Sequence, residues 1–203
     1  MLFKKKIRVV KGKAADIIIS EFDGKVVSLR PVDDSDDTIE LLSKWRDKYW
    51  DGFDTKFKVT NDGTKKWIKS IQEKDDRILF LIIFDNKKIG HVGLDGYNEN
   101  ENSIFFTDFM RGVRGFSPKL MEHIEKLFIK WIFDELEISA IQLRVFSDNY
   151  KTINLHERCG FLTVDCIPLK RDFFNHDWKW KETTLKEGEY AERYFSIMKL
   201  YNN

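Results

Sequence analysis

The stretch FMRGVRGFSPKLM, residues 109–121, decides the fold that we predict for this chain. A β-rich run, SIFFTDFM at 103–110, leads into a basic turn that contains two glycines, at 111–116. Ser117 is a good N-cap, and Pro118 suits the first position of a helix because its missing N–H would have no partner there. Apolar residues then recur at the spacing of one helix face, at Leu120, Ile124, Leu127, Phe128, Trp131 and Ile132. The sequence therefore predicts a strand, a tight turn and a long helix that ends near residue 137.

A strand that enters a glycine turn and then a helix N-terminus is a physical device for binding phosphate. Free backbone N–H groups point outward there, the helix dipole is positive, and glycine lets a ligand approach the main chain. Arg111 and Arg114 would add side-chain charge. The alternative is a strand–helix junction that needs glycine only for its turn, and the turn by itself does not decide between the two.

The composition limits the class of protein. A length of 203 residues suits one domain with a modest extension, and the net charge of +1 argues against a nucleic-acid binder. No apolar run is long enough to cross a bilayer, so we expect no membrane partner. Cys159 and Cys166 form no metal or redox motif and indicate reduced thiols in a cytoplasmic protein. The 14% of aromatic residues favours a bulky core over an aromatic-walled acceptor pocket.

The sequence before this stretch predicts an N-terminal extension, residues 1–24, with short strands at 7–10 and 16–22, packed on a main domain at 25–203. A strand at 25–32 is followed by four aspartates, which we interpret as the entry to a helix capped by Ser35 or Asp37 rather than as a metal site. An irregular segment at 51–59, a helix at 64–74, a doubly buried strand at 77–84, a turn at 85–88 and a return strand at 88–97 complete this half.

The sequence after the long helix predicts a strand at 140–146, an amphipathic helix within 147–161 that closes at Gly160, and a strand over 161–174 that ends near Pro168. A polar hairpin loop at 175–191 and a last strand at 193–201 follow. These elements predict an α/β (α+β) fold with a mixed, mostly antiparallel central sheet flanked by helices.

Two stretches resemble the GNAT superfamily of acetyl-CoA-dependent N-acetyltransferases. SDNYKTINLHERCGF, residues 147–161, supplies the family pattern in register at Asn149, Ile153, Leu155, Glu157, Arg158, Gly160 and Phe161. Gly115 and Ser117 fit the last two positions of the pyrophosphate loop, whereas its leading basic position falls on Gly112, next to Arg111. Leu29 to Pro31, Trp45, Trp67 and the pair Ile89-Gly90 also resemble the branch that contains ribosomal-protein N-terminal acetyltransferases.

The resemblance implies that acetyl-CoA lies in a V-shaped splay between two parallel strands, 103–110 and 140–146. The residues expected to bind it are Phe109, Met110, Arg111, Val113, Arg114, Gly115, Phe116, Ser117 and Asn149. Asn149 could instead form an Asx turn that opens its helix. His156 takes the place of the tyrosine that protonates the departing thiolate in many members, and imidazolium can donate a proton near neutral pH.

The other catalytic candidate is a base, because an amine is mostly protonated at pH 7 and must lose a proton before it attacks a thioester. Asp108 is the first candidate, since it lies on the strand beside the expected thioester, and Asp95 and His91 come next. Phe105, Phe106 and Phe109 could raise the pKa of the Asp108 carboxyl by desolvation. Strand alternation does not decide whether Asp108 faces the cleft or solvent.

We therefore expect an enzyme that transfers an acetyl group to a primary amine of a small molecule, with a nucleotide-linked amino sugar as the first acceptor to consider. The extension and the aromatic segment 173–195 could shape a roomy pocket for it. The alternatives are acetylation of a protein N-terminus and a non-catalytic acyl-CoA-binding module. A homodimer is left open.

Overall fold

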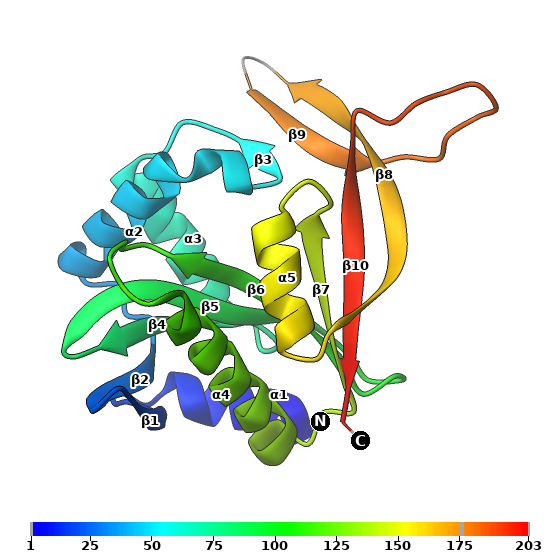
Figure 1. Ribbon diagram of the computed structural model, residues 1–203. Coiled ribbons are helices and arrows are strands. Elements are labelled where there is room, and N and C mark those ends of the chain that lie inside the picture. Colours follow the sequence, from blue (N-terminus) through cyan, green and yellow to red (C-terminus); the bar gives the residue numbers. More distant parts are fainter. Residues whose placement is uncertain (1, 175–176, 203) are drawn as a thin grey trace.

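A single large sheet organises the computed structural model, which describes residues 2–174 and 177–202 (Figure 1). Its ten strands lie in the order β1-β2-β4-β5-β6-β7-β10-β8-β9-β3. Their bounds are β1 Ile18–Phe22, β2 Lys25–Pro31, β3 Thr55–Lys56, β4 Ile78–Phe84, β5 Lys87–Asn98, β6 Ser103–Arg111, β7 Ala140–Phe146, β8 Leu162–Phe174, β9 Asp177–Glu182 and β10 Arg193–Tyr201. Every neighbouring pair is antiparallel except β6 and β7, which are parallel. The predicted mixed, mostly antiparallel sheet is confirmed.

Helices cover both faces of the sheet. In Figure 1, α2 (Asp36–Lys48) and α3 (Asn61–Glu73) lie above strands β4 to β6, and α1 (Leu2–Lys11) and α4 (Pro118–Leu136) lie below them. The shorter α5 (Tyr150–Arg158) follows β7, and a 3-10 turn, η1 (Trp50–Gly52), follows α2. None of the described helices is both long enough and apolar enough to span a membrane.

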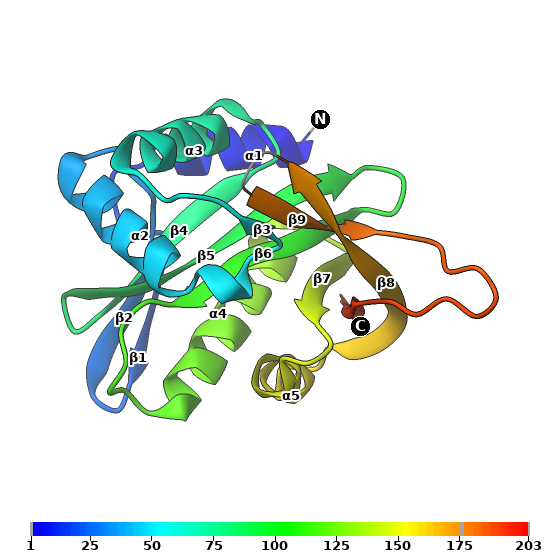
Figure 2. The same cartoon turned by 90° about the horizontal axis from the view of Figure 1, so that it is seen from above.

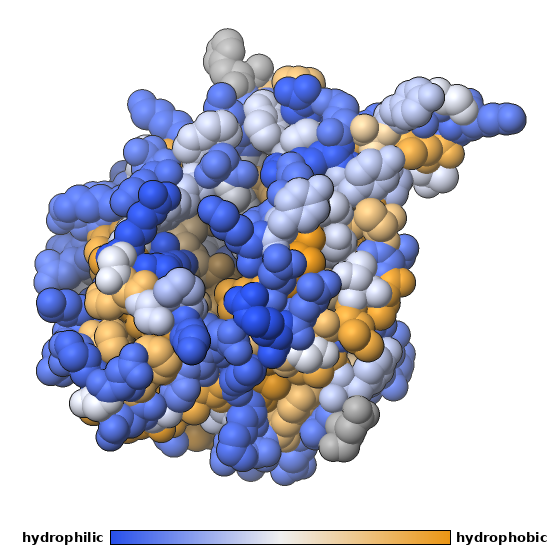
Figure 3. All heavy atoms as spheres, in the orientation of Figure 1, coloured by the Kyte–Doolittle hydropathy of each residue, from blue (hydrophilic) through white to orange (hydrophobic). Residues whose placement is uncertain are grey.

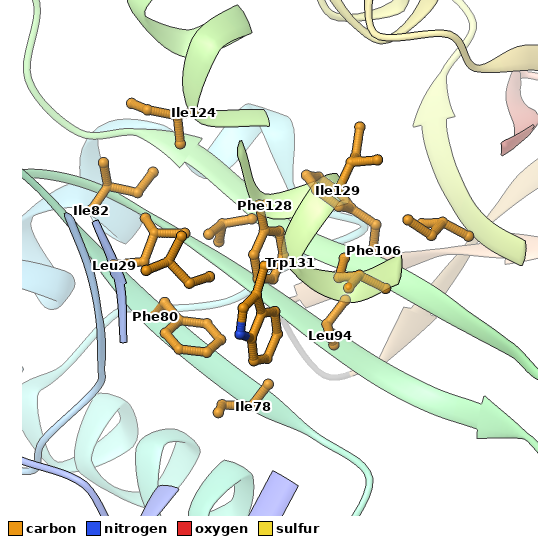
Figure 4. Packing of buried hydrophobic residues seen from close by; sticks show 14 of the residues in the cluster. Leu29, Ile78, Phe80, Ile82, Leu94, Phe106, Ile124, Phe128, Ile129 and Trp131 are labelled. Atoms are coloured by element: carbon orange, nitrogen blue, oxygen red, sulfur yellow. The ribbon is translucent and has the colours of Figure 1, made fainter. Parts of the chain in front are cut away.

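Strand β4 shows why both faces need cover. Its even-numbered residues pack with α4, whereas Leu79 and Leu81 pack with α2 and α3. Phe80 meets the rings of Phe128 and Trp131 edge-on, with centroids 5.6 and 5.4 Å away, as Figure 4 shows. A continuous apolar run is what a strand between two helical layers requires.

The decisive stretch folds as predicted. Strand β6 is followed by a loop, and α4 begins at Pro118 with Ser117 as N-cap, whose hydroxyl accepts a hydrogen bond from the Lys119 N–H. The helix ends before Glu137, which has a left-handed backbone with φ +57°. Strand β7 then lies parallel to β6, so α4 is the crossover that joins them.

The prediction of a strand at 7–10 is wrong, because these residues belong to α1. Phe3 and Ile7 are buried one helical turn apart, which is a helix period rather than a strand period. Phe3 stacks on Tyr97 of β5 with ring centroids 4.2 Å apart, and the Lys11 ammonium donates to the carbonyl of Ile71 at the end of α3. The extension thus packs on the core through a helix.

Two further predictions in the C-terminal half are wrong. Strand β8 continues beyond Pro168 to Phe174, because the residues after the proline pair with β9. Strand β9 lies where a polar loop was expected, and it pairs with β8 on one side and with β3 on the other. Residues 175 and 176 of that expected loop lie outside the described residues.

Candidate active site

The cleft lies where β6 and β7 separate. The two strands pair only from Ser103 to Phe105, opposite Ala140 to Gln142, and then diverge. A cleft of about 1260 Å³ lies between the two arms and is lined by Phe105 to Arg111 on one side and by Leu143 to Phe146 on the other. The predicted V-shaped splay is therefore present. Figure 3 shows this face of the molecule, with hydrophilic residues around its edge and hydrophobic residues mainly in its middle and lower part.

The segment between α2 and α3 roofs the cleft. Residues 51–55 line it, and β3 pairs with Trp178 and Lys179 of β9. The Trp180 N–H also donates to the Asp54 carbonyl at 2.7 Å. The paired β3 and β9 lie above α5 and the ends of β6 and β7 in Figure 1, and Figure 2 shows them crossing over β6. An acceptor must therefore enter a partly covered space.

The loop before α4 divides into two parts. The N–H groups of Gly112 and Val113 both donate to the Ile89 carbonyl, at 2.8 and 3.1 Å. The Arg111 guanidinium donates to the carbonyls of Val113 and Phe116, at 3.0 and 2.9 Å, and so braces the loop. In the described part of the chain, the N–H groups of residues 114–117 have no protein acceptor. These four donors surround the positive end of α4 and fit an anion such as a diphosphate.

The two glycines of the loop have different tasks. A Cβ on Gly112 would lie 2.1 Å from the buried Trp45 ring, so this glycine exists for the close approach of Trp45. Gly115 has φ +101° and nothing within 4 Å of the position of a Cβ. Glycine is needed at this position because residues with a side chain rarely adopt such a backbone conformation, and the missing side chain leaves the loop open to a ligand.

His156 lies on α5 and lines the cleft, although it is only 4% exposed. Its Nδ1 lies 2.5 Å from Oε1 of Glu125, a residue of α4 with no exposed surface. The Glu125 carboxylate accepts a hydrogen bond from the Nδ1–H group, so Nε2 is the nitrogen that can exchange a proton with another group. Around the imidazole stand the rings of Phe106, Phe109 and Phe161. Such a carboxylate fixes the orientation of a histidine ring, as in catalytic triads.

Sequence reasoning missed Glu125, although a signal was present. It lies on the apolar face of α4, between Met121 and Ile129 at helical spacing. A carboxylate at such a position is unusual, because burying it lowers stability unless a partner compensates for the lost hydration. The other nearby titratable group is Cys159, whose pKa is raised by burial and then by the charge of Glu125. A raised pKa keeps this thiol protonated at neutral pH, and the thiolate is the nucleophilic form of cysteine.

Asp108 faces the cleft, which resolves the question that strand alternation left open. It has φ +55° at a bulge in β6, where the pairing with β5 shifts register. Its carboxylate accepts from the Thr107 hydroxyl at 3.1 Å and lies 3.4 Å from the Arg77 guanidinium, which also reaches Asp95. The bulge turns this side chain out of the ladder and toward the cleft.

His91 lies behind Asp108. It is 1% exposed, its Nδ1 donates to the Asp108 carbonyl at 2.5 Å, and its Nε2 has no partner among the described residues. Burial lowers its pKa, so the ring is neutral at pH 7 and Nε2 carries the lone pair. His91 therefore holds the bulge in place from a second strand.

The remaining predicted residues fall into two groups. Phe109, Met110, Arg111 and Asn149 line the cleft, whereas Val113, Arg114, Gly115, Phe116 and Ser117 form the loop that leads from it to α4. The Asn149 side chain accepts from the Thr152 N–H and caps α5, as the Asx alternative predicted. Phe116 packs edge-on against Phe84, with centroids 5.5 Å apart. Its main chain, rather than its ring, faces outward.

Comparisons with known proteins agree with this geometry. Over 130 residues the chain is 26% identical to the acetyltransferase PseH of Campylobacter jejuni, covering 63% of this chain and 78% of that protein. The fold matches the spermidine N-acetyltransferase of Vibrio cholerae, solved with CoA and spermine, with a TM-score of 0.67 and 15% identity over 86% of this chain and 95% of that one. It also matches RimL, a ribosomal L7/L12 alpha-N-protein acetyltransferase solved with CoA, with a TM-score of 0.66 and 11% identity over 90% and 97% of the two chains.

The acetyltransferase (GNAT) domain matches residues 27–162, which is more than half of the chain and includes β6, the loop, α4, β7 and all of α5. The splayed parallel strands, the free amides at the start of α4 and the cleft-lining His156 all lie within these residues. The chain therefore belongs to the GNAT family of acetyltransferases.

Proposed function

We propose that this protein transfers the acetyl group of acetyl-CoA to a primary amine of a small molecule. The observation that carries the proposal is the His156–Glu125 pair, in which a carboxylate orients an imidazole that lines the same cleft as Asp108. Acetyl-CoA supplies the acetyl group as an activated thioester. The N–H groups of residues 114–117 would hold its diphosphate, since they are free of protein acceptors in the described part of the chain.

Each catalytic side chain has one proton to move. The Asp108 carboxylate accepts the proton that the attacking amine must lose, and the Arg77 and Thr107 contacts hold it toward the cleft. His156 gives a proton from Nε2 to the thiolate that leaves, while Glu125 keeps Nδ1 protonated and the ring in place. The edge of β6 that faces β7 is unpaired beyond Phe105, and its main-chain donors would stabilise an oxyanion.

A nucleotide-linked amino sugar is the acceptor that we propose. The cleft is large, is lined on one side by residues 51–55, which include the start of β3, and has Tyr49, Phe53, Phe57 and Trp67 in its lining. Aromatic side chains of this kind stack well on sugar rings and bases. The V. cholerae structure with spermine and the ribosomal-protein acetyltransferase define two other acceptor classes for the test, a polyamine and a peptide N-terminus.

The experiment measures free thiol released from acetyl-CoA with three acceptors: UDP-glucosamine, spermidine and a peptide with a free N-terminus. We expect turnover with the first, and a loss of about 100-fold or more in kcat for His156→Ala, because general acid catalysis contributes about 10²–10⁴-fold. His123→Ala is the matched control on α4, since His123 contacts Ser20. Calorimetric binding of acetyl-CoA without thiol release on any amine would instead identify a non-catalytic binding module.

A further inference from the structure

The cations that line the cleft differ in the protein groups that they contact. Five of them are held by the protein itself: Lys74 by Asp95, Arg77 by Asp95 and Asp108, Arg111 by two carbonyls, Arg144 by Glu182 and Arg193 by Asp148. Arg46, on α2, also lines the cleft, and no carboxylate lies within ion-pair distance of it in the part of the chain that the structure describes. Among the described residues that line the cleft, Arg46 and Arg111 are therefore the two cations without a carboxylate partner, and the Arg111 guanidinium is already occupied by two main-chain carbonyls.

Aromatic rings fix the Arg46 guanidinium in place. Its central carbon lies 4.5 Å from the centre of the Trp67 ring and 4.9 Å from that of Phe57. One of its nitrogens donates to the Thr64 hydroxyl at 3.1 Å. A guanidinium has five N–H donors in a rigid fork, so most of them remain free beside the cleft. The side chain is therefore held in place by two aromatic rings and one hydrogen bond to a neutral hydroxyl group.

A half-buried cation without an anion lowers stability unless a ligand compensates it. The planar fork of arginine matches phosphate geometry with two parallel hydrogen bonds. Because Arg46 is already ordered by Trp67, Phe57 and Thr64, a phosphate would bind it with little loss of side-chain entropy. These three residues come from α3 and from the segment that leads into it, which also forms the roof.

We propose that Arg46 binds a phosphate group of the acceptor and so selects phosphate-bearing amines, such as nucleotide-linked amino sugars, over polyamines. This inference rests on the proposed function and names its substrate class. A polyamine would bring further positive charge to a cation that has no counter-ion on the described chain, which disfavours it. Arg46 is among the residues that line the cleft, whereas residues 114–117, whose free amides suit the diphosphate of acetyl-CoA, are not, so the two anion sites use different residues.

Binding is tested by calorimetry with UDP as the probe, on protein saturated with CoA so that the amides at 114–117 are filled. We expect Arg46→Gln to weaken UDP binding about 10- to 100-fold, since hydrogen bonds to charged groups are the stronger ones. Arg46→Lys keeps the charge without the fork and should give an intermediate loss. Lys44→Gln removes the same charge from the exposed side of α2, where Lys44 pairs with Glu40, and should leave UDP binding unchanged.

Two results would overturn the inference: no UDP binding to the CoA-saturated wild-type protein, or equal UDP affinity in the Arg46→Gln and Lys44→Gln variants. A thermal unfolding curve for each variant confirms that the fold is kept. Turnover measurements distinguish a failure of the Arg46 inference from a failure of the proposed acetyltransferase function. If UDP-glucosamine and glucosamine are acetylated alike and Arg46→Gln changes neither, the acetyltransferase stands and the role of Arg46 does not.

Discussion

Gly112 offers the sharpest test of how the loop between β6 and α4 is built. In the Gly112→Ala variant the new Cβ would lie 2.1 Å from Cε2 and 2.2 Å from Cδ2 of Trp45. Ordinary contact begins at 3.4 Å, so the closest pair must separate by 1.3 Å. The backbone has little freedom to move, because the Gly112 N–H donates to Ile89 and the Gly112 carbonyl accepts from the Tyr49 hydroxyl. The indole is 4% exposed and packs among Leu42, Ile68 and Leu81, so it cannot swing into solvent without loss.

The expected cost follows from these contacts. Overpacking a core usually costs about 1–3 kcal/mol, and the fixed groups on both sides of Gly112 place this change at about 3 kcal/mol. For a domain of this length each kcal/mol lowers Tm by about 2–4 °C, so Tm should fall by roughly 6–12 °C. Gly115→Ala meets no neighbour, and its cost should be only the strain of a positive φ, about 1–2 kcal/mol.

The assay is chemical denaturation of each variant, followed by calorimetry with acetyl-CoA. Gly24→Ala is the control, because Gly24 also has a positive φ and open space but lies in the hairpin between β1 and β2. Gly115→Ala and Gly24→Ala should lose similar stability, whereas only Gly115→Ala should weaken acetyl-CoA binding, by about tenfold, if one hydrogen bond to the diphosphate is lost. A Gly112→Ala protein as stable as Gly115→Ala would refute the reasoning about Trp45.

Two other predictions concern titratable groups away from the loop. Burial lowers the pKa of His91 below its ordinary value of 6.5, so the unfolded chain takes up the proton first. The free energy of unfolding should therefore fall as pH drops below about 6.5, by at most about 1.4 kcal/mol per pH unit. Urea unfolding at several pH values should show a shallower pH dependence for His91→Asn than for the wild-type protein, and the same dependence in both would contradict this prediction. Burial, and then the charge of Glu125, raise the pKa of the Cys159 thiol, whereas Cys166 is exposed. Iodoacetamide at pH 8 should therefore label Cys166 and leave Cys159 unlabelled until urea is added. Equal labelling of both cysteines, measured by mass spectrometry of the folded protein, would contradict this prediction.

The sequence could predict what short-range rules determine. Ser117 and Pro118 start α4 where capping rules place it, and the alternating partners of β4 follow from its continuous apolar run. The position of His156 in the cleft followed from the register of residues 147–161 with a family pattern. The phosphate-like loop was also found, although Gly112 turned out to serve Trp45, because a close approach between distant residues leaves no mark on local sequence.

The sequence could not predict features that depend on distant pairing. Strand β3 has two residues and no period, and it exists because β9 lies beside it. The left-handed backbone of Asp108 depends on a register shift between β5 and β6 and on the hydrogen bond from His91. The short helix α1 has only two buried apolar residues, one turn apart, and this weak helix period becomes decisive through the packing of Phe3 on Tyr97 and the contact of Lys11 with α3.

Three of the polar groups that the protein leaves incompletely satisfied lie in the cleft or in contact with a residue that lines it. Among the described residues, Oε2 of the fully buried Glu125 and Nε2 of the buried His91 have no hydrogen-bond partner, and no carboxylate lies within ion-pair distance of Arg46. Each lowers stability where an apolar residue of similar volume would pack without loss. Yet His91 and Arg46 line the same cleft, and Glu125 touches His156, which lines it too. Two of these costs are explained by positioning, because Glu125 orients His156 and His91 holds the Asp108 bulge, and the cost of Arg46 is explained if an anionic ligand binds it in the cleft.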